Sequence, residues 1–145
     1  MSDKKKLSII QFDSDDHYFT VIDLILSTWG MELAGKAFSP NSATRLFERI
    51  QKGEIKPDIA IVEADMGKSE EDGKKISAKL RDAAPGIKII GFSVIENSEW
   101  SDYEAIKGLK DTNKVITDIL SKVTGNEYKI SNTEDGKVPE EISND

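Results

Sequence analysis

Residues 57–66 of the chain read PDIAIVEADM. The turn-forming pair Pro57-Asp58 leads into the apolar run Ile59–Val62, which has the length and the β-branched composition of a strand buried on both faces. The run stops at Glu63, and Asp65 follows two residues later. We therefore predict a buried parallel strand with acidic residues at its carboxyl end.

The same pattern recurs before and after this strand. Four more short apolar runs predict strands, and between them apolar residues fall at the three- and four-residue spacing of amphipathic helices. Strands that alternate with helices imply right-handed crossovers and a parallel sheet covered on both faces. The fold class predicted is α/β, a flavodoxin-like doubly wound sheet of five parallel strands in the order 2-1-3-4-5. The further strands are expected at 7–12, 32–38, 87–92 and 105–109, and the helices at 17–29, 40–50, 76–83 and 112–123.

Composition excludes several classes of function. The chain has 145 residues with a net charge of −7, which disfavours nucleic acid because a phosphate backbone requires a basic face. It has no cysteine and a single histidine, so thiol catalysis, disulfides and multi-histidine metal sites are excluded. No apolar stretch approaches the length of a membrane helix. We expect a cytoplasmic protein without membrane contact.

Charge divides the chain into two parts. Residues 125–145, called here the acidic tail, carry six acids against two lysines and no apolar period. We predict a single folded domain over residues 1–124, followed by a mostly disordered tail that aids solubility. A short docking segment around Tyr128–Ile130 is the alternative for the tail.

Polar residues follow four of the five predicted strands. Because the carboxyl ends of parallel strands share one edge of a sheet, we expect these side chains to form one polar pocket there. They are Asp13, Ser14 and Asp15 after the first strand, Glu63 and Asp65 after the third, Ser93 after the fourth and Lys110 after the fifth.

At these residues the chain resembles the receiver domains of two-component response regulators, which are chemotaxis-regulator-like. The resemblance covers about residues 5–124. It rests on the segments LSIIQFDSD at 7–15, PDIAIVEADM at 57–66, Asp72-Gly73, IIGFS at 89–93 and Leu109-Lys110-Asp111.

The resemblance also implies roles for individual residues. In the family an aspartate after the third strand accepts phosphate from a kinase histidine, and two acids after the first strand hold Mg²⁺ with it. A serine or threonine and a lysine contact the phosphoryl group. Position by position, Glu63 takes the acceptor place, Asp13 and Ser14 the acid pair, Ser93 the switch hydroxyl and Lys110 the lysine.

This sequence departs from the family pattern in ways that bear on phosphorylation. The carboxylate of Glu63 lies one methylene further out than that of an aspartate, and phosphoryl transfer depends steeply on alignment. Ser14 replaces one of the hard oxygen ligands that Mg²⁺ prefers, and Asp15 lies one residue too far along. The segment between Ser93 and Lys110 is several residues short, so the fourth helix of the family should be shortened or missing.

We therefore predict a degenerate receiver, or pseudo-receiver. It would act in signal transduction by binding a signalling protein, without aspartyl phosphorylation, without enzymatic activity and without a cofactor, although Asp13 and Glu63 could bind Mg²⁺ weakly. A homodimer is the alternative to a complex with another protein. Trp100 and Lys107 are candidate interface residues, Lys107 because it falls where many members have a switch aromatic.

Two other functions fit parts of the sequence. A working receiver would be phosphorylated on Asp65 or Glu63. A small phosphatase like the haloacid dehalogenases would use Asp13 as nucleophile and Asp15 as acid/base, because the two stand in an Asp-any-Asp motif after an apolar strand. For the pseudo-receiver we expect Glu63 to pair with Lys110, with Ser93 drawn toward the same site; the alternative is a vestigial pocket in which Glu63 faces solvent.

Overall fold

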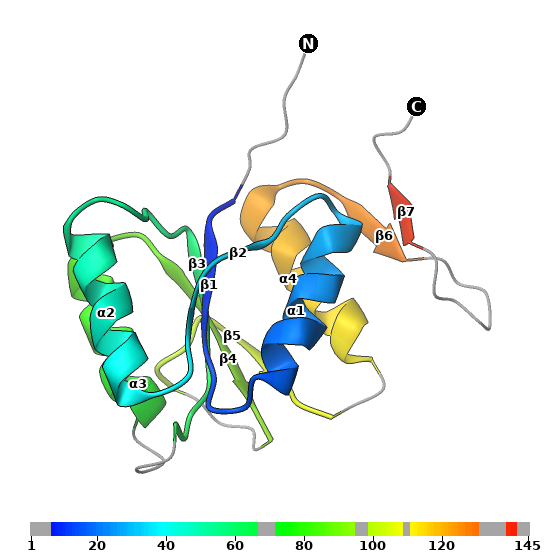
Figure 1. Ribbon diagram of the computed structural model, residues 1–145. Coiled ribbons are helices and arrows are strands. Elements are labelled where there is room, and N and C mark those ends of the chain that lie inside the picture. Colours follow the sequence, from blue (N-terminus) through cyan, green and yellow to red (C-terminus); the bar gives the residue numbers. More distant parts are fainter. Residues whose placement is uncertain (1–6, 67–71, 95–98, 109–110, 131–138, 142–145) are drawn as a thin grey trace.

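The computed structural model describes residues 7–66, 72–94, 99–108, 111–130 and 139–141. Five parallel strands form one sheet in the order β2-β1-β3-β4-β5, which confirms the predicted fold class (Figure 1). The strands are β1 (Ile9–Phe12), β2 (Leu33–Ala37), β3 (Ile59–Val62), β4 (Lys88–Ser93) and β5 (Tyr103–Ile106). The helices are α1 (His17–Thr28), α2 (Pro40–Gln51), α3 (Asp72–Ala83) and α4 (Thr112–Thr124).

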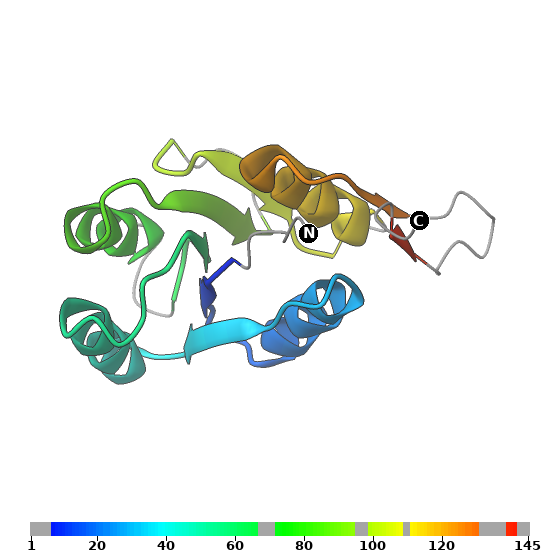
Figure 2. The same ribbon diagram turned by 90° about the horizontal axis from the view of Figure 1, so that it is seen from above.

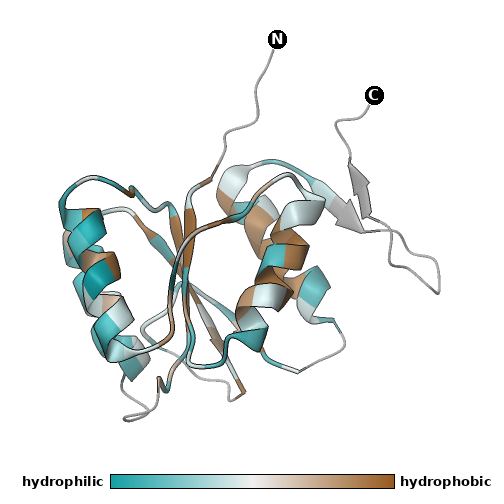
Figure 3. Ribbon diagram, viewed as in Figure 1, coloured by the Kyte–Doolittle hydropathy of each residue, from teal (hydrophilic) through white to brown (hydrophobic). Residues whose placement is uncertain are grey.

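Helices cover both faces of this sheet, as Figure 2 shows from above. The helices α1 and α4 pack on one face over Ile9, Ile61 and Phe92, and α2 and α3 pack on the other over Ile10 and Val62. Residues that alternate along a strand point to opposite faces, so the continuous apolar runs of β1 and β3 supply both cores. Hydropathy follows this division, with hydrophobic residues on the strands and on the sides of α1 and α4 that meet the sheet (Figure 3).

Local sequence signals explain where several helices begin and end. Ser39 accepts a hydrogen bond from the Ser42 N–H in a capping box, and Pro40 occupies the first turn of α2. Gly125 ends α4 in the left-handed region at φ 76°, a conformation that costs glycine nothing. No helix in the part of the chain that the structure describes is long and apolar enough to cross a bilayer.

Between β4 and β5 the described residues, 94 and 99–102, contain no helix. The Trp100 ring is half-buried against the core on the α2 and α3 side. A Cβ on Gly73 would lie 2.7 Å from this ring and 2.7 Å from the Glu63 carbonyl oxygen, so only glycine fits at the start of α3. Trp100, predicted as a candidate interface residue, therefore serves as packing between this connection and α3.

The prediction of a mostly disordered tail stays a prediction, because 131–138 and 142–145 lie outside the described residues, but the first residues of the tail are ordered. Tyr128–Ile130 forms strand β6, which pairs antiparallel with β7 (Pro139–Glu141). The Tyr128 side chain is buried, and its ring centroid lies 5.0 Å from that of Trp29. Because one aromatic contact pins the segment to the domain, the Tyr128–Ile130 stretch packs on its own fold.

Candidate functional site

The predicted polar pocket lies at the carboxyl edge of the sheet, at the bottom of Figure 1. Phe12 of β1 pairs with Val62 of β3, which in turn pairs with Gly91 of β4. The next residues along these strands, Asp13 and Glu63, therefore stand side by side. They point to the face covered by α1 and α4, since they continue the alternation of Ile9 and Ile61.

Lys107 joins these two carboxylates. Its Nζ lies 2.7 Å from Glu63 Oε2 and 2.8 Å from Asp13 Oδ2, and its side chain is only 2% exposed. The ammonium also lies over the Tyr18 ring, 4.3 Å from the centroid, which is a favourable place for a cation. Asp13, Glu63 and Lys107 thus form a buried charge cluster with one negative charge in excess.

The lysine of this cluster is not the one that the sequence analysis chose. Strand β5 ends at Ile106, and its first residue lies two positions before the expected start, so Lys107 directly follows the strand. The assignment of Lys107 to an interface is wrong, because the side chain is buried; Lys110 lies outside the described residues. The signal in the sequence was Gly108, which follows Lys107 directly. In the structure it has φ 81°, in the left-handed region that favours glycine, and the strand has ended before it.

Ser14 donates the remaining hydrogen bonds to the Glu63 carboxylate. The backbone N–H of Ser14 donates to Glu63 Oε1 at 2.9 Å, and its hydroxyl donates to the same oxygen at 2.8 Å. Glu63 therefore has a partner on each carboxylate oxygen, and its side chain is 16% exposed. The predicted partner of Glu63 was Lys110, which lies outside the described residues; in the structure Glu63 pairs with Lys107, so its carboxylate does not simply face solvent.

The remaining candidate residues lie around this centre. The Ser93 hydroxyl accepts a hydrogen bond from the Ala64 N–H at 2.8 Å, so Ser93 holds the backbone beside Glu63 and not its carboxylate. Asp65 is exposed at the rim. Asp15 is also exposed; its N–H donates to Asp13 Oδ1 at 3.0 Å, and its own carboxylate accepts from the His17 N–H at 2.9 Å.

Asp13 has the most perturbed acidity in the pocket. Burial raises the pKa of its carboxyl from 3.8 to about 6, an effect that the Lys107 ammonium and the Asp15 N–H only partly offset. Asp13 Oδ2 meets Lys107 as an ion pair and makes no directed hydrogen bond. The Asp13 side chain is fully buried in the structure.

The residues present do not fit Mg²⁺. The ion requires several oxygen ligands in near-octahedral geometry, and at this place Ser14 offers two donors to Glu63 while the Lys107 ammonium lies between the two carboxylates. Among the described residues no group of three or more His, Cys, Asp or Glu side chains could hold a metal ion.

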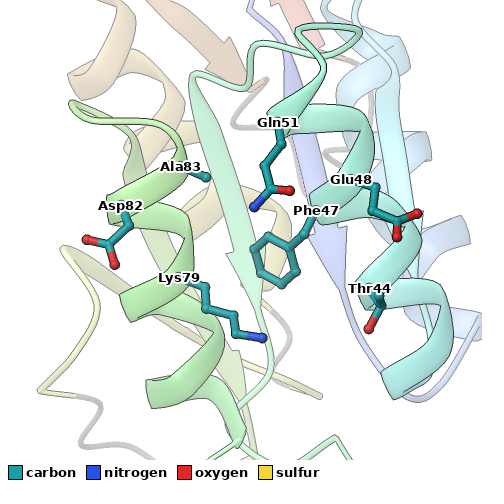
Figure 4. Close-up of a pocket in the computed structure, with 7 residues that line it drawn as sticks. All are labelled: Thr44, Phe47, Glu48, Gln51, Lys79, Asp82 and Ala83. Atoms are coloured by element: carbon teal, nitrogen blue, oxygen red, sulfur yellow. The ribbon is translucent and has the colours of Figure 1, made fainter.

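A separate groove lies between α2 and α3, which cover the face of the sheet opposite to α1 and α4 (Figure 4). Its volume is about 560 Å³, and Phe47 lies on its floor with the Lys79 ammonium 5.5 Å from the ring centroid. Its walls carry Glu48, Asp82 and Lys79, and no sequence motif pointed to it.

Solved structures match the fold over most of the chain. A CheY-like response regulator receiver domain from Methanospirillum hungatei aligns with a TM-score of 0.64 at 17% identity, covering 82% of this chain and 94% of that one. A response regulator from Thermotoga maritima aligns with a TM-score of 0.66 at 14% identity, covering 84% and 100%. The isolated REC domain of RcsB from Salmonella enterica serovar Typhimurium gives 0.62 at 15% identity, covering 81% and 90%.

Neither a protein-family model nor a curated protein sequence matches the chain. The structural likenesses lie below 20% identity and establish the receiver fold alone. What the pocket does must be argued from its own residues.

Proposed function

We propose that this chain is a pseudo-receiver, a receiver-fold signalling module that works by binding another protein and is not phosphorylated on a carboxylate. The observation that carries the proposal is the state of Glu63. Both of its oxygens already accept hydrogen bonds, two from Ser14 and one from Lys107. A carboxylate held in this way is a poor nucleophile, because attack on phosphorus would first have to break these charge-assisted hydrogen bonds.

The proposal extends to cofactors and partners. The site needs no metal ion, because the Lys107 ammonium supplies the positive charge between the two carboxylates. The chain has no enzymatic activity in this proposal, and its partner is a signalling protein, not nucleic acid or a membrane, in keeping with the net charge of −7.

The direct test is incubation of the protein with acetyl phosphate and Mg²⁺, followed by intact-mass measurement. We expect no stable gain of one phosphate. A stoichiometric adduct that disappears in Glu63→Gln or in Asp65→Asn would show a working receiver and would overturn the proposal.

A control is needed for a negative result. A receiver domain known to accept phosphate from acetyl phosphate, treated in the same tube, must gain the expected mass. Hydrolysis of an aryl phosphate that depends on Mg²⁺ and is lost in Asp13→Asn would instead support a phosphatase.

A further inference from the structure

Three hydrogen-bond donors bind the Glu63 carboxylate, and the neighbouring Asp13 carboxylate shares one of them, the Lys107 ammonium. Ser14 N–H, Ser14 Oγ–H and Lys107 Nζ lie at 2.9, 2.8 and 2.7 Å from its two oxygens. Lys107 is itself fixed by Asp13 and by the Tyr18 ring, and with a side chain 2% exposed it is part of the built interior. The Lys107 ammonium therefore has contacts other than Glu63 that hold its position.

This donor set has the wrong polarity for a cation and the right one for an anion. A backbone amide, a hydroxyl and an ammonium directed at one point match the requirements of a carboxylate or another small oxyanion. The residue at position 14 determines whether an anion is accepted, because a carboxylate there would repel the Glu63 oxygen that the Ser14 hydroxyl binds at 2.8 Å. The place that suits Mg²⁺ in a receiver is thus electrostatically inverted here.

We propose that this pocket is a carboxylate-binding site whose resident ligand is the chain's own Glu63 side chain, and that a free small carboxylate binds there once that side chain is cut back. This inference rests on the proposed function, since it explains why Glu63 is unavailable for phosphorylation. It adds a ligand class and a set of binding atoms: Ser14 N and Oγ, and Lys107 Nζ.

The test is rescue of the full-length Glu63→Ala variant by sodium acetate, compared with sodium chloride at equal ionic strength. The alanine leaves both the donors and the space for an acetate ion. We expect a saturable rise in melting temperature, roughly 3–6 °C at about ten times the dissociation constant, because a ligand that binds only the folded state stabilises it by mass action.

Glu63→Gln is the matched control, since the amide fills the same volume and should leave no room for acetate. Acetate should also fail to stabilise the wild-type protein, and Ser14→Ala in the Glu63→Ala background should weaken the rescue. Equal responses of the alanine and glutamine variants, or no response in either, would overturn the inference. So would a larger stabilisation of Glu63→Ala by magnesium chloride than by sodium acetate.

If Glu63→Ala is unfolded in chloride, far-ultraviolet circular dichroism replaces the melting temperature. Acetate should then restore the helical signal, and failure to restore it while Glu63→Gln folds would count against the site. The phosphorylation test uses the wild-type protein, so a failed rescue leaves the proposed function standing, whereas a phosphate adduct on Glu63 refutes that function whatever acetate does.

Discussion

Replacement of Asp13 by asparagine should make folding stability less dependent on pH. Asp13 is fully buried, and the pKa of its carboxyl is about 6 in the folded protein against 3.8 in the unfolded chain. Because the folded state binds the proton more tightly, the stability that Asp13 contributes is complete below pH 3.8 and is lost as the pH rises through about 6. Asparagine keeps an oxygen for the Asp15 N–H and cannot ionise.

The size of the effect follows from the two pKa values. At about 1.4 kcal/mol per pKa unit, the displacement from 3.8 to about 6 corresponds to about 3 kcal/mol in all. Slightly over 1 kcal/mol of it should appear between about pH 5 and pH 7, by the same linkage relation. Asp13→Asn should match the wild-type protein near pH 4, where the native carboxyl is protonated, and should be the more stable protein at pH 7.5.

Urea unfolding at a series of pH values measures this directly, with the free energy of unfolding of the variant compared with that of the wild type at each pH. Asp16→Asn is the control, because Asp16 is exposed and makes no capping hydrogen bond, so its curve should run parallel to that of the wild type. Parallel curves for Asp13→Asn as well would refute the argument that burial controls the acidity of Asp13.

Three further changes test the packing and pairing of the fold. Lys107→Met should destabilise the protein by about 3–5 kcal/mol, because it leaves the carboxylates of Asp13 and Glu63 without their cation. A double-mutant cycle with Glu63→Gln, measured by urea unfolding, should show a coupling energy above about 1 kcal/mol, and additive effects would contradict the pairing. Tyr128→Ala should lower the free energy of unfolding by about 2–4 kcal/mol because a buried ring is lost, and an unchanged melting temperature would mean that the acidic tail does not pack. Gly73→Ala should cost about 1–3 kcal/mol through overlap with the Trp100 ring and the Glu63 carbonyl oxygen. A smaller residue at position 100 should rescue part of this loss; absence of rescue would mean that the Glu63 carbonyl, and not the ring, accounts for the clash.

The parts of the fold that the sequence predicts well are those in which local pattern and burial agree. The run Ile59–Val62 is fully buried and forms a strand with the bounds expected from its hydrophobicity. Strand β5 is different, because Tyr103–Ile106 is an edge strand in which only Ala105 is buried and Glu104 is exposed. Its position is fixed by pairing with β4, which a single sequence does not reveal, and the resulting error moved the expected site lysine from Lys107 to Lys110.

The first residues of the tail were missed for a related reason. Composition describes the average solvation of a segment, and that of the acidic tail predicts disorder. One aromatic residue reverses this locally, because Tyr128 meets Trp29, which lies far away in the sequence at the end of α1. The pocket was easier to predict, since Asp13, Ser14 and Glu63 follow strands whose carboxyl ends must meet at one edge.

The departures of this pocket from a phosphorylation site depend on one another physically. If Glu63 stood beside an acid at position 14, two carboxylates would face each other in a site that already has one negative charge in excess. If Ser14 stood beside an aspartate, its amide and hydroxyl would face a side chain one methylene too short. With both changes present, Ser14, Glu63 and Lys107 each have partners within 3 Å. Loss of a function without a replacement tends to leave buried polar groups without partners, which is costly. The mutual fit of these three side chains therefore supports the proposed carboxylate-binding pocket.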